Sequence, residues 1–298
     1  MEIKEIETEF VKNEEALSIW DGSSEDYSWN NVEENEFHIK TAAQLAGLAY
    51  LVNHGHTFKG KTIYLDTDID LDENEWVPIG TKVFWCMSIL HKERYFSGTF
   101  DGQHHFIKNL TTYSHNYCHG LFGYVYEGKI KNIRIIDACI DDNEIVDNSN
   151  KYLGILVDRA EYSCILNSYT TGNITNESKK IVSSGGVVGI CKYYSKVRGC
   201  YSSATIESNC FHEDKYANFG GICGGIDDTF VSDCWFGGSI NCFHNDLFIG
   251  GIIGIVFNYK KKPIIINNCF VIINDTKEKS CKNSFIANID EYSEEYSI

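Results

Sequence analysis

The stretch GGICGGIDDTFVSDCWFGGSI (residues 220–240) repeats the plan of GGVVGICKYYSKVRGCYSSATI (residues 185–206). Both begin with two glycines and a short apolar run, pass through a polar turn, and continue into a Cys-aromatic pair. Three further copies span residues 120–140, 153–174 and 250–273. Spacings of 35, 32, 34 and 33 residues separate one shared apolar position, occupied by Ile130, Ile165, Val197, Val231 and Ile264. The chain therefore contains an internal repeat with a period of about 33 residues.

The composition of the repeat favours strands over helices. Ankyrin and tetratricopeptide repeats have similar periods, but each of their units needs two helices. The units here are rich in β-branched, aromatic and glycine residues. We therefore predict an all-β fold, a parallel β-helix (solenoid) in which equivalent residues stack about 4.8 Å apart along the axis. Two adjacent columns follow from this register, namely Ser168, Cys200, Cys234 and Cys269, and beside it Tyr169, Tyr201, Trp235 and Phe270.

The segments before the repeat predict one helix and one long strand. Residues 41–53, TAAQLAGLAYLVN, carry apolar residues at helical spacing. Thr41 and Gln44 form a capping box, and Gly55 lies where the helix should stop. Residues 61–71, KTIYLDTDIDL, alternate between two faces, with Ile63, Leu65, Thr67, Ile69 and Leu71 on one of them.

Composition and charge exclude several functions. The chain of 298 residues carries a formal charge of −16, from 42 acidic and 26 basic residues. Nucleic acid and anionic membrane surfaces require clustered Lys and Arg, so we expect neither partner. No run reaches the roughly 18 apolar residues of a membrane span. The N-terminus lacks the apolar core of a signal peptide, which favours a cytoplasmic location and free thiols for the twelve cysteines.

Four glycine motifs resemble a known family. GLFG (120–123), GVVG (186–189), GICG (221–224) and GIIG (251–254) resemble the GLUG motif of bacterial surface-protein repeats. The block FHIKTAAQLAGLAYLVNHGHTFKGKTIYLDTDIDL (37–71) and the segment FSGTFDGQHHFIKNL (96–110) are similar to what precedes those repeats. The second copy departs from the motif, because GILV (154–157) places Val157 where the last glycine should be.

The resemblance implies a domain organisation and a location. The resemblance covers residues 37–273 approximately and implies a right-handed parallel β-helix with an N-terminal capping helix. We predict that this domain spans residues 37–290, between an acidic extension (1–36) and an acidic tail (291–298). It also implies a secreted or cell-surface, adhesin-like protein. The family supplies structural glycines and no catalytic residues.

A duplicated hexapeptide supplies the candidate site. NCFHED (209–214) returns as NCFHND (241–246), which puts the same side chains in equivalent loops of neighbouring coils. The candidate ligand-binding residues are Phe211, His212, Asp214, Phe243, His244 and Asp246. Two His and two Asp could hold zinc or manganese, the loops could form a ridge that contacts a glycan or a protein, or they could be a duplication without function. We assign no metal and no cofactor.

Other clusters give weaker signals. Asp66, Asp68, Asp70 and Asp72 have the D-x-D-x-D spacing of a calcium loop, but Leu71 and Val77 occupy the positions of its glycine and glutamate. We expect these carboxylates to face water. His115 and His119 have the spacing of half a zinc site.

The sequence thus favours a non-catalytic module that recognises glycan or a protein partner through one flank of the solenoid. One alternative is a carbohydrate-active enzyme, a polysaccharide lyase or hydrolase, with a shallow groove on that flank. The carboxylate pairs Asp141-Asp142 and Asp227-Asp228 do not favour it, because adjacent strand residues point to opposite faces. A further alternative is a structural or phage-type fibre module. The oligomeric state stays open.

Overall fold

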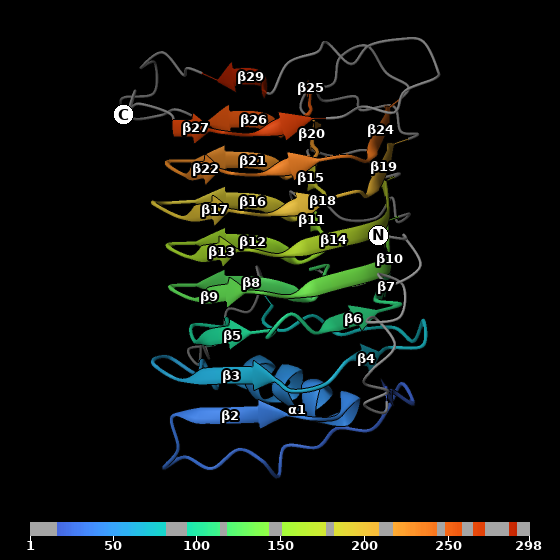
Figure 1. Cartoon of the computed structure of the whole chain (residues 1–298), viewed down its shortest axis with the longest axis vertical. Coiled ribbons are helices and arrows are strands. Elements are labelled where there is room, and N and C mark those ends of the chain that lie inside the picture. The colour runs from blue at the N-terminus through green and yellow to red at the C-terminus, as the bar shows by residue number, and fades with distance from the viewer. Residues whose placement is uncertain are drawn as a thin grey trace, which may run out of the picture.

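The computed structural model describes residues 17–81, 94–113, 118–142, 151–176, 182–208, 217–242, 248–257, 265–271 and 286–290. These residues form a parallel β-solenoid, which confirms the predicted all-β class (Figure 1). Every strand pair in it is parallel, and partners come from successive turns of the chain. Four sheets run along the stack, and we name them A to D.

Sheet A contains β1 (Ser18–Ile19), β4 (Ile69–Asp70), β6 (Phe106–Lys108), β7 (Thr111–Tyr113), β10 (Arg134–Asp142), β14 (Tyr169–Asn176), β18 (Tyr201–Ser202), β19 (Thr205–Ser208), β23 (Trp235–Phe236), β24 (Ser239–Cys242) and β28 (Phe270–Val271). Sheet B contains β2 (Glu36–Ile39), β3 (Thr62–Leu65), β5 (Thr99–Asp101), β9 (Lys129–Lys131), β13 (Cys164–Leu166), β17 (Lys196–Arg198), β22 (Phe230–Ser232) and β27 (Ile265–Asn267).

Sheet C contains β8 (Phe122–Tyr126), β12 (Val157–Glu161), β16 (Val188–Lys192), β21 (Cys223–Asp227), β26 (Ile253–Phe257) and β29 (Ile286–Asp290). Sheet D contains β11 (Lys151–Gly154), β15 (Val182–Gly185), β20 (Asn218–Gly220) and β25 (Phe248–Gly250). The repeats form five coils, which we number from β8 onward. From coil 2 each coil visits sheets D, C, B and A in that order, so each repeat unit is one turn of the solenoid.

The pairing confirms the predicted columns and corrects two details of the register. Tyr169, Tyr201, Trp235 and Phe270 are successive partners in sheet A. Val231 pairs with Ile266, so the fifth equivalent position is Ile266 and not Ile264. Val157 pairs with Phe122 and Val188, so Asp158, and not Val157, stands where the other copies have the last motif glycine.

The core lies inside the coils. At each inward-facing position of a strand, the equivalent residues of successive coils form one buried column. Ile130, Ile165, Val197 and Val231 are fully buried along sheet B. The prediction of one long strand over residues 61–71 is wrong, because the segment forms β3 in sheet B and β4 in sheet A with a corner between them. Its predicted inward face is confirmed, because all five residues are buried, with Thr67 the most exposed at 8%. Burial of such apolar columns supplies the main driving force of the fold.

The motif glycines lie where sheet C passes close to the preceding coil. A Cβ on Gly224 would be 2.5 Å from the Ser183 carbonyl carbon and 2.5 Å from the Ser184 nitrogen. A Cβ on Gly254 would be 2.6 Å from the Phe219 nitrogen. The backbones approach too closely for any side chain, which explains why the motif requires glycine.

The predicted helix is confirmed as α1 (Ala42–Asn53), with Thr41 as its N-cap. The Thr41 hydroxyl accepts from the Gln44 N–H at 3.2 Å, and the Gln44 side chain accepts from the Lys40 N–H rather than from the Thr41 N–H. α1 follows β2 and leads back to β3 beside it, so it takes the place of the rest of one turn (Figure 1). Part of the acidic extension also joins the fold, since β1 pairs with β4 and Trp20 is buried.

Candidate functional site: the outer face of sheet A

A column of aromatic side chains follows the outer face of sheet A through coils 2 to 5. The rings of Tyr169 and Tyr201 are stacked, with centroids 4.8 Å apart and planes within 3°. The Tyr201 and Trp235 centroids are 5.0 Å apart with a 43° tilt. Exposure rises toward the end of the column, to 44% for Trp235 and 61% for Phe270. We call these four residues the aromatic column.

Two polar columns run beside the aromatic column on the same outer face. The first contains Cys139, Asn173, Thr205 and Ser239, and the second contains Asp141, Thr175, Glu207 and Asn241. Within them, the Ser239 hydroxyl contacts the Thr205 hydroxyl at 3.3 Å, and the Asn241 amide donates to Glu207 at 3.2 Å. Gly237 separates the polar and aromatic columns in coil 4, where a Cβ would be 3.1 Å from the Tyr201 hydroxyl oxygen. The face therefore offers apolar rings next to rows of hydrogen-bonding groups.

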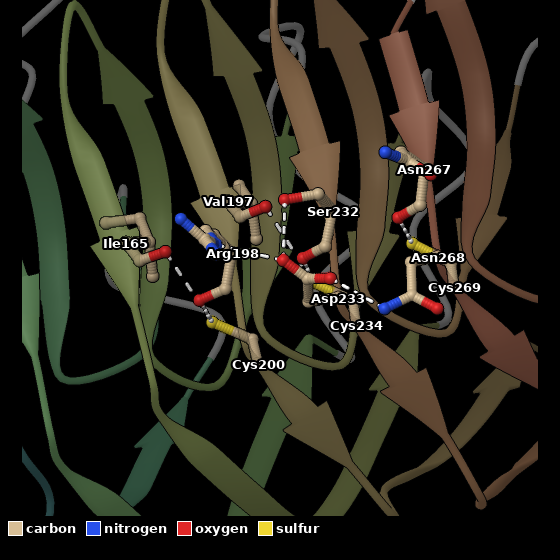
Figure 2. Close-up of polar contacts among 10 residues, drawn as sticks. All are labelled: Ile165, Val197, Arg198, Cys200, Ser232, Asp233, Cys234, Asn267, Asn268 and Cys269. Atoms are coloured by element: carbon tan, nitrogen blue, oxygen red, sulfur yellow. Dashed lines mark hydrogen bonds and ion pairs between the residues drawn. The ribbon is translucent and has the colours of Figure 1, made fainter.

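The corner before the aromatic column fixes where its rings point. In every coil two residues join sheet B to sheet A. The first has a positive φ in all five coils, where the residues are Asn132, Asn167, Gly199, Asp233 and Asn268. Asn, Asp and Gly adopt this left-handed conformation most readily, and their side chains can bond to neighbouring coils. Asp233 does so, accepting from Arg198 at 2.9 Å and from Asn268 at 2.7 Å (Figure 2).

The second corner residue points inward and forms the predicted cysteine column. Figure 2 shows Cys200, Cys234 and Cys269 in one row across neighbouring coils, with Cys234 behind Asp233. All three are free thiols, and Cys200 and Cys234 are buried. The Cys234 sulfur donates to the Ser232 carbonyl at 3.1 Å, and the hydrogen bond to Cys200, followed by burial, raises the pKa of this thiol. The hydrogen bonds of Asn268 and Arg198 lower the pKa of Asp233.

The hexapeptide residues predicted to bind ligand lie outside the described part of the chain. These are Phe211, His212, Asp214, Phe243, His244 and Asp246. The structure does describe the strands from which their loops leave. β19 ends at Ser208 and β24 ends at Cys242, and these two residues are partners in sheet A. Both loops therefore leave sheet A at equivalent positions of neighbouring coils, beside the second polar column.

The expectation that the four aspartate carboxylates of residues 66–72 face water is confirmed for the exposed Asp72 and wrong for the buried Asp70, and Asp66 and Asp68 are partly exposed. Asp66, Asp68 and Asp70 also contact groups of neighbouring coils. Asp66 contacts His38 at 2.9 Å, and Asp68 contacts His105 at 3.0 Å. Asp70 is 6% exposed and contacts Lys108 at 2.9 Å. These contacts link neighbouring N-terminal coils to one another. His115 lies outside the described residues, and His119 is buried.

Sequence reasoning missed a second polar-aromatic cluster, on sheet C. The Tyr124 hydroxyl donates to Glu161 at 3.0 Å, and Glu161 also accepts from Arg159 at 2.6 Å. Burial, with the charge of Glu161, raises the pKa of Tyr124. The rings of Tyr162 and Tyr193 stack nearby at 5.3 Å. The sequence signal was the charged residue at the end of several sheet C strands, namely Glu161, Lys192 and Asp227.

Within the described residues, no group of three or more His, Cys, Asp or Glu side chains is arranged to hold a metal ion. The one helix that the structure describes, α1, is too short to cross a membrane, and no other helix suited to that occurs in those ranges.

Comparison with known proteins gives one similarity in structure. No protein-family model and no curated protein sequence matches the chain. The chain is similar in structure to a Bacteroides ovatus protein described as a candidate immunoglobulin A1 protease. The sequence identity is 17%, the TM-score is 0.48, and the match covers 85% of this chain and 83% of that chain.

Proposed function

We propose that this protein is a non-catalytic binding module that recognises an uncharged glycan through the outer face of sheet A. The aromatic column is the observation that carries the proposal. Aromatic rings present a large apolar surface at low entropic cost and commonly serve as contact sites when they are exposed. The hydroxyl, amide and carboxylate groups of the two polar columns stand beside these rings and match the hydrogen-bonding needs of sugar hydroxyls.

The repeat of the face supports a polymeric ligand. Equivalent groups recur at each coil, so a chain that lies along the axis meets the same contacts several times. Repetition raises the affinity of individually weak contacts through effective concentration. The formal charge of −16 opposes an anionic polysaccharide, which is why we specify an uncharged one.

The hexapeptide loops extend the proposed site. They leave sheet A from the paired residues Ser208 and Cys242, next to the polar column that contains Glu207 and Asn241. We propose that His212 and His244, with Asp214 and Asp246, add contacts at the edge of the face. Phe211 and Phe243 would add apolar surface there.

A carbohydrate-active enzyme is the second candidate, because the same face carries the carboxylates Asp141 and Glu207. A glycosidase places two carboxyl groups on opposite sides of the scissile bond. Asp141 and Glu207 belong to one column with Thr175 between them, so they stand side by side along the axis. Two strand spacings separate them, roughly 10 Å. This arrangement favours binding over hydrolysis.

The test compares two exposed aromatic residues of the same coil. Trp235 lies in the aromatic column on sheet A, and Phe230, 38% exposed, lies on sheet B. We expect Trp235→Ala to weaken binding to neutral polysaccharides on a glycan array about tenfold, which corresponds to the loss of ~1.4 kcal/mol. Phe230→Ala should bind as the unchanged protein does, and both variants should keep their melting temperature.

Three results would count against the proposal. Binding to no neutral glycan would remove it, and equal losses for the two variants would place the site elsewhere. Release of reducing sugar from the same glycans, abolished by Glu207→Gln, would establish the enzyme instead. The double change of His212 and His244 to Ala tests the loops separately from the face.

A further inference from the structure

Coil 2 carries a buried carboxyl group where the other coils carry a motif glycine. Asp158 aligns with Gly123 and Gly189 and is 3% exposed. In the later coils the equivalent position lies against a strand of sheet D, as Gly189 lies against β11. The first described strand of sheet D is β11 itself, so the segment beneath Asp158 is different. The Asp158 carboxyl group bonds to Cys118 there, which explains how a side chain fits.

A buried amine and a second buried carboxyl group interact electrostatically with Asp158. Asp142 ends β10, and Lys151 begins β11. The Lys151 Nζ is 2.6 Å from the Asp142 Oδ1, and the two side chains are 9% and 0% exposed. Two other Lys–Asp pairs of the protein, Lys131–Asp101 and Lys108–Asp70, have similar contacts, but their lysine side chains are 32% exposed. The Lys151–Asp142 pair is thus the most deeply buried of the three.

Burial makes charged groups costly at this place in the fold. Transfer of an ion pair from water into a protein interior costs several kcal/mol, which the attraction between the charges does not always repay. Burial raises the pKa of Asp158 well above its ordinary value, and the charge of Asp142 acts in the same direction against the lowering effects of Arg159, Cys118 and Lys151. The protonated form of Asp158 is therefore favoured more than that of an exposed aspartate. Its Oδ1 has no hydrogen-bond partner within the described ranges.

We propose that Lys151 and Asp142 condense into an intramolecular amide cross-link, with Asp158 as the proton carrier. Proton transfer from the Lys151 ammonium to the Asp142 carboxylate gives a neutral amine and a carboxylic acid. The Nζ lone pair attacks the Asp142 Cγ, while Asp158 donates a proton to the carbonyl oxygen and regains one from the nitrogen. The Cγ–O bond to the hydroxyl group breaks, and that group leaves with a proton as water. No oxidant or reductant takes part.

Position and solvent exclusion drive the reaction. The 2.6 Å contact to Oδ1 leaves Cγ one bond further from Nζ, in the range in which positioned groups react. The product is an uncharged amide, which removes the cost of a buried ion pair. The cross-link closes the corner between sheets A and D across residues 143–150. It therefore ties coil 1 to coil 2 covalently at the one place where Asp158 interrupts the glycine motif.

The mass of the intact full-length protein tests the proposal directly. We expect the denatured, reduced protein to be lighter than its sequence mass by one water molecule. Trypsin should not cleave after the acylated Lys151, so residues 135–159 should appear as one peptide that is lighter by one water. The sequence mass, with peptides 135–151 and 152–159 instead, would overturn the proposal. A succinimide at an aspartate also loses one water but leaves Lys151 cleavable, and this result would overturn it too.

Variants separate the chemistry from the ion pair. Lys151→Arg keeps the charge pair and should have its full sequence mass. Asp142→Asn should lose ammonia in place of water, and Asp158→Asn should slow the loss of mass while circular dichroism stays unchanged. Lys131→Arg is the matched control at an exposed pair and should keep the cross-link. Full and rapid loss of water in Asp158→Asn would exclude Asp158 as the proton carrier.

Discussion

A comparison of Gly224→Ala with Gly225→Ala tests the close approach of neighbouring coils. The two glycines are adjacent in β21 and therefore face opposite sides of sheet C. A Cβ on Gly224 meets backbone atoms at 2.5 Å, and these atoms belong to a paired strand that cannot yield locally. A Cβ on Gly225 meets only side-chain atoms, at 3.2 Å from Phe257, 3.3 Å from Ile255 and 3.4 Å from Ser183. The same methyl group therefore has two different consequences.

The expected magnitudes follow from these contacts. Overpacking of a core costs ~1–3 kcal/mol, and the loss of glycine flexibility in the unfolded chain returns ~0.4–1 kcal/mol. We expect Gly224→Ala to lower the free energy of unfolding by about 2 kcal/mol, which lowers the melting temperature by about 4–8 °C for a domain of this size. Gly225→Ala should leave the melting temperature unchanged or raise it slightly.

Thermal unfolding followed by circular dichroism distinguishes these outcomes when both variants and the unchanged protein are measured in one buffer. Urea unfolding at fixed temperature provides a second measure of the same difference. Equal melting temperatures for the two variants would refute the reasoning, because they would show that the motif glycines are not held against a neighbouring backbone.

Three other predictions follow from the electrostatics and the packing. Burial raises the pKa of Asp70 and of Asp101, but their hydrogen-bond partners outweigh it and hold both pKa values below the ordinary value. These partners are Lys108, Asp72 and Asn109 for Asp70, and Lys131, Asn132 and Gln103 for Asp101. Their stabilisation is present above about pH 4 and is lost as the pH falls, so changing both to Asn should lower stability at pH 7 and flatten the acid dependence of urea unfolding. Burial raises the pKa of Cys191 to about 12 and also raises that of Cys223. We therefore expect these two thiols to resist iodoacetamide at pH 8 in the native protein and to react in denaturant, as peptide mass mapping would show. Asp233→Ala removes the hydrogen bonds to Arg198 and Asn268. It also leaves an alanine at a φ of 54°, a left-handed conformation that alanine adopts less readily than Asp or Gly. It should cost roughly 1–2 kcal/mol in thermal unfolding, while Asp233→Gly should cost less.

The fold could be predicted because a solenoid repeats one environment per position. Residues that share a column share a size and a polarity, so Cys200 and Cys234 fill one slot and Tyr201 and Trp235 another. The exact register was harder. In the second copy the glycine at 154 falls one place too early, and only strand pairing shows that Asp158 is the residue that replaces the motif glycine.

The candidate site was less predictable. Alternation along a strand indicates which face of the sheet a side chain is on, but not which side chains of the neighbouring coil it contacts. Alternation placed Asp66, Asp68 and Asp70 on an outward face, but it did not indicate that two histidines and a lysine would contact them there. The aromatic column was recognised as a stack. Its exposure, and the polar columns beside it, depend on the whole sheet. Whether the hexapeptides bind a ligand stays a prediction.

The corners of the coils differ in how freely their length has varied. Two residues join sheet D to sheet C in coils 2 to 5, and two residues join sheet B to sheet A in all five coils. The connections from sheet A to sheet D have lengths of eight, five, nine and five residues after β10, β14, β19 and β24. The connections from sheet C to sheet B have two residues in coils 1, 2 and 4, three after β16 and seven after β26. Residues inserted into the four connections from sheet A to sheet D leave the pairing register of the strands unchanged. One residue added at a two-residue corner would instead shift the register of the strands that follow it in the coil. New recognition sequences can therefore be added along one edge of the molecule without changing the register of the strands in the rest of each coil.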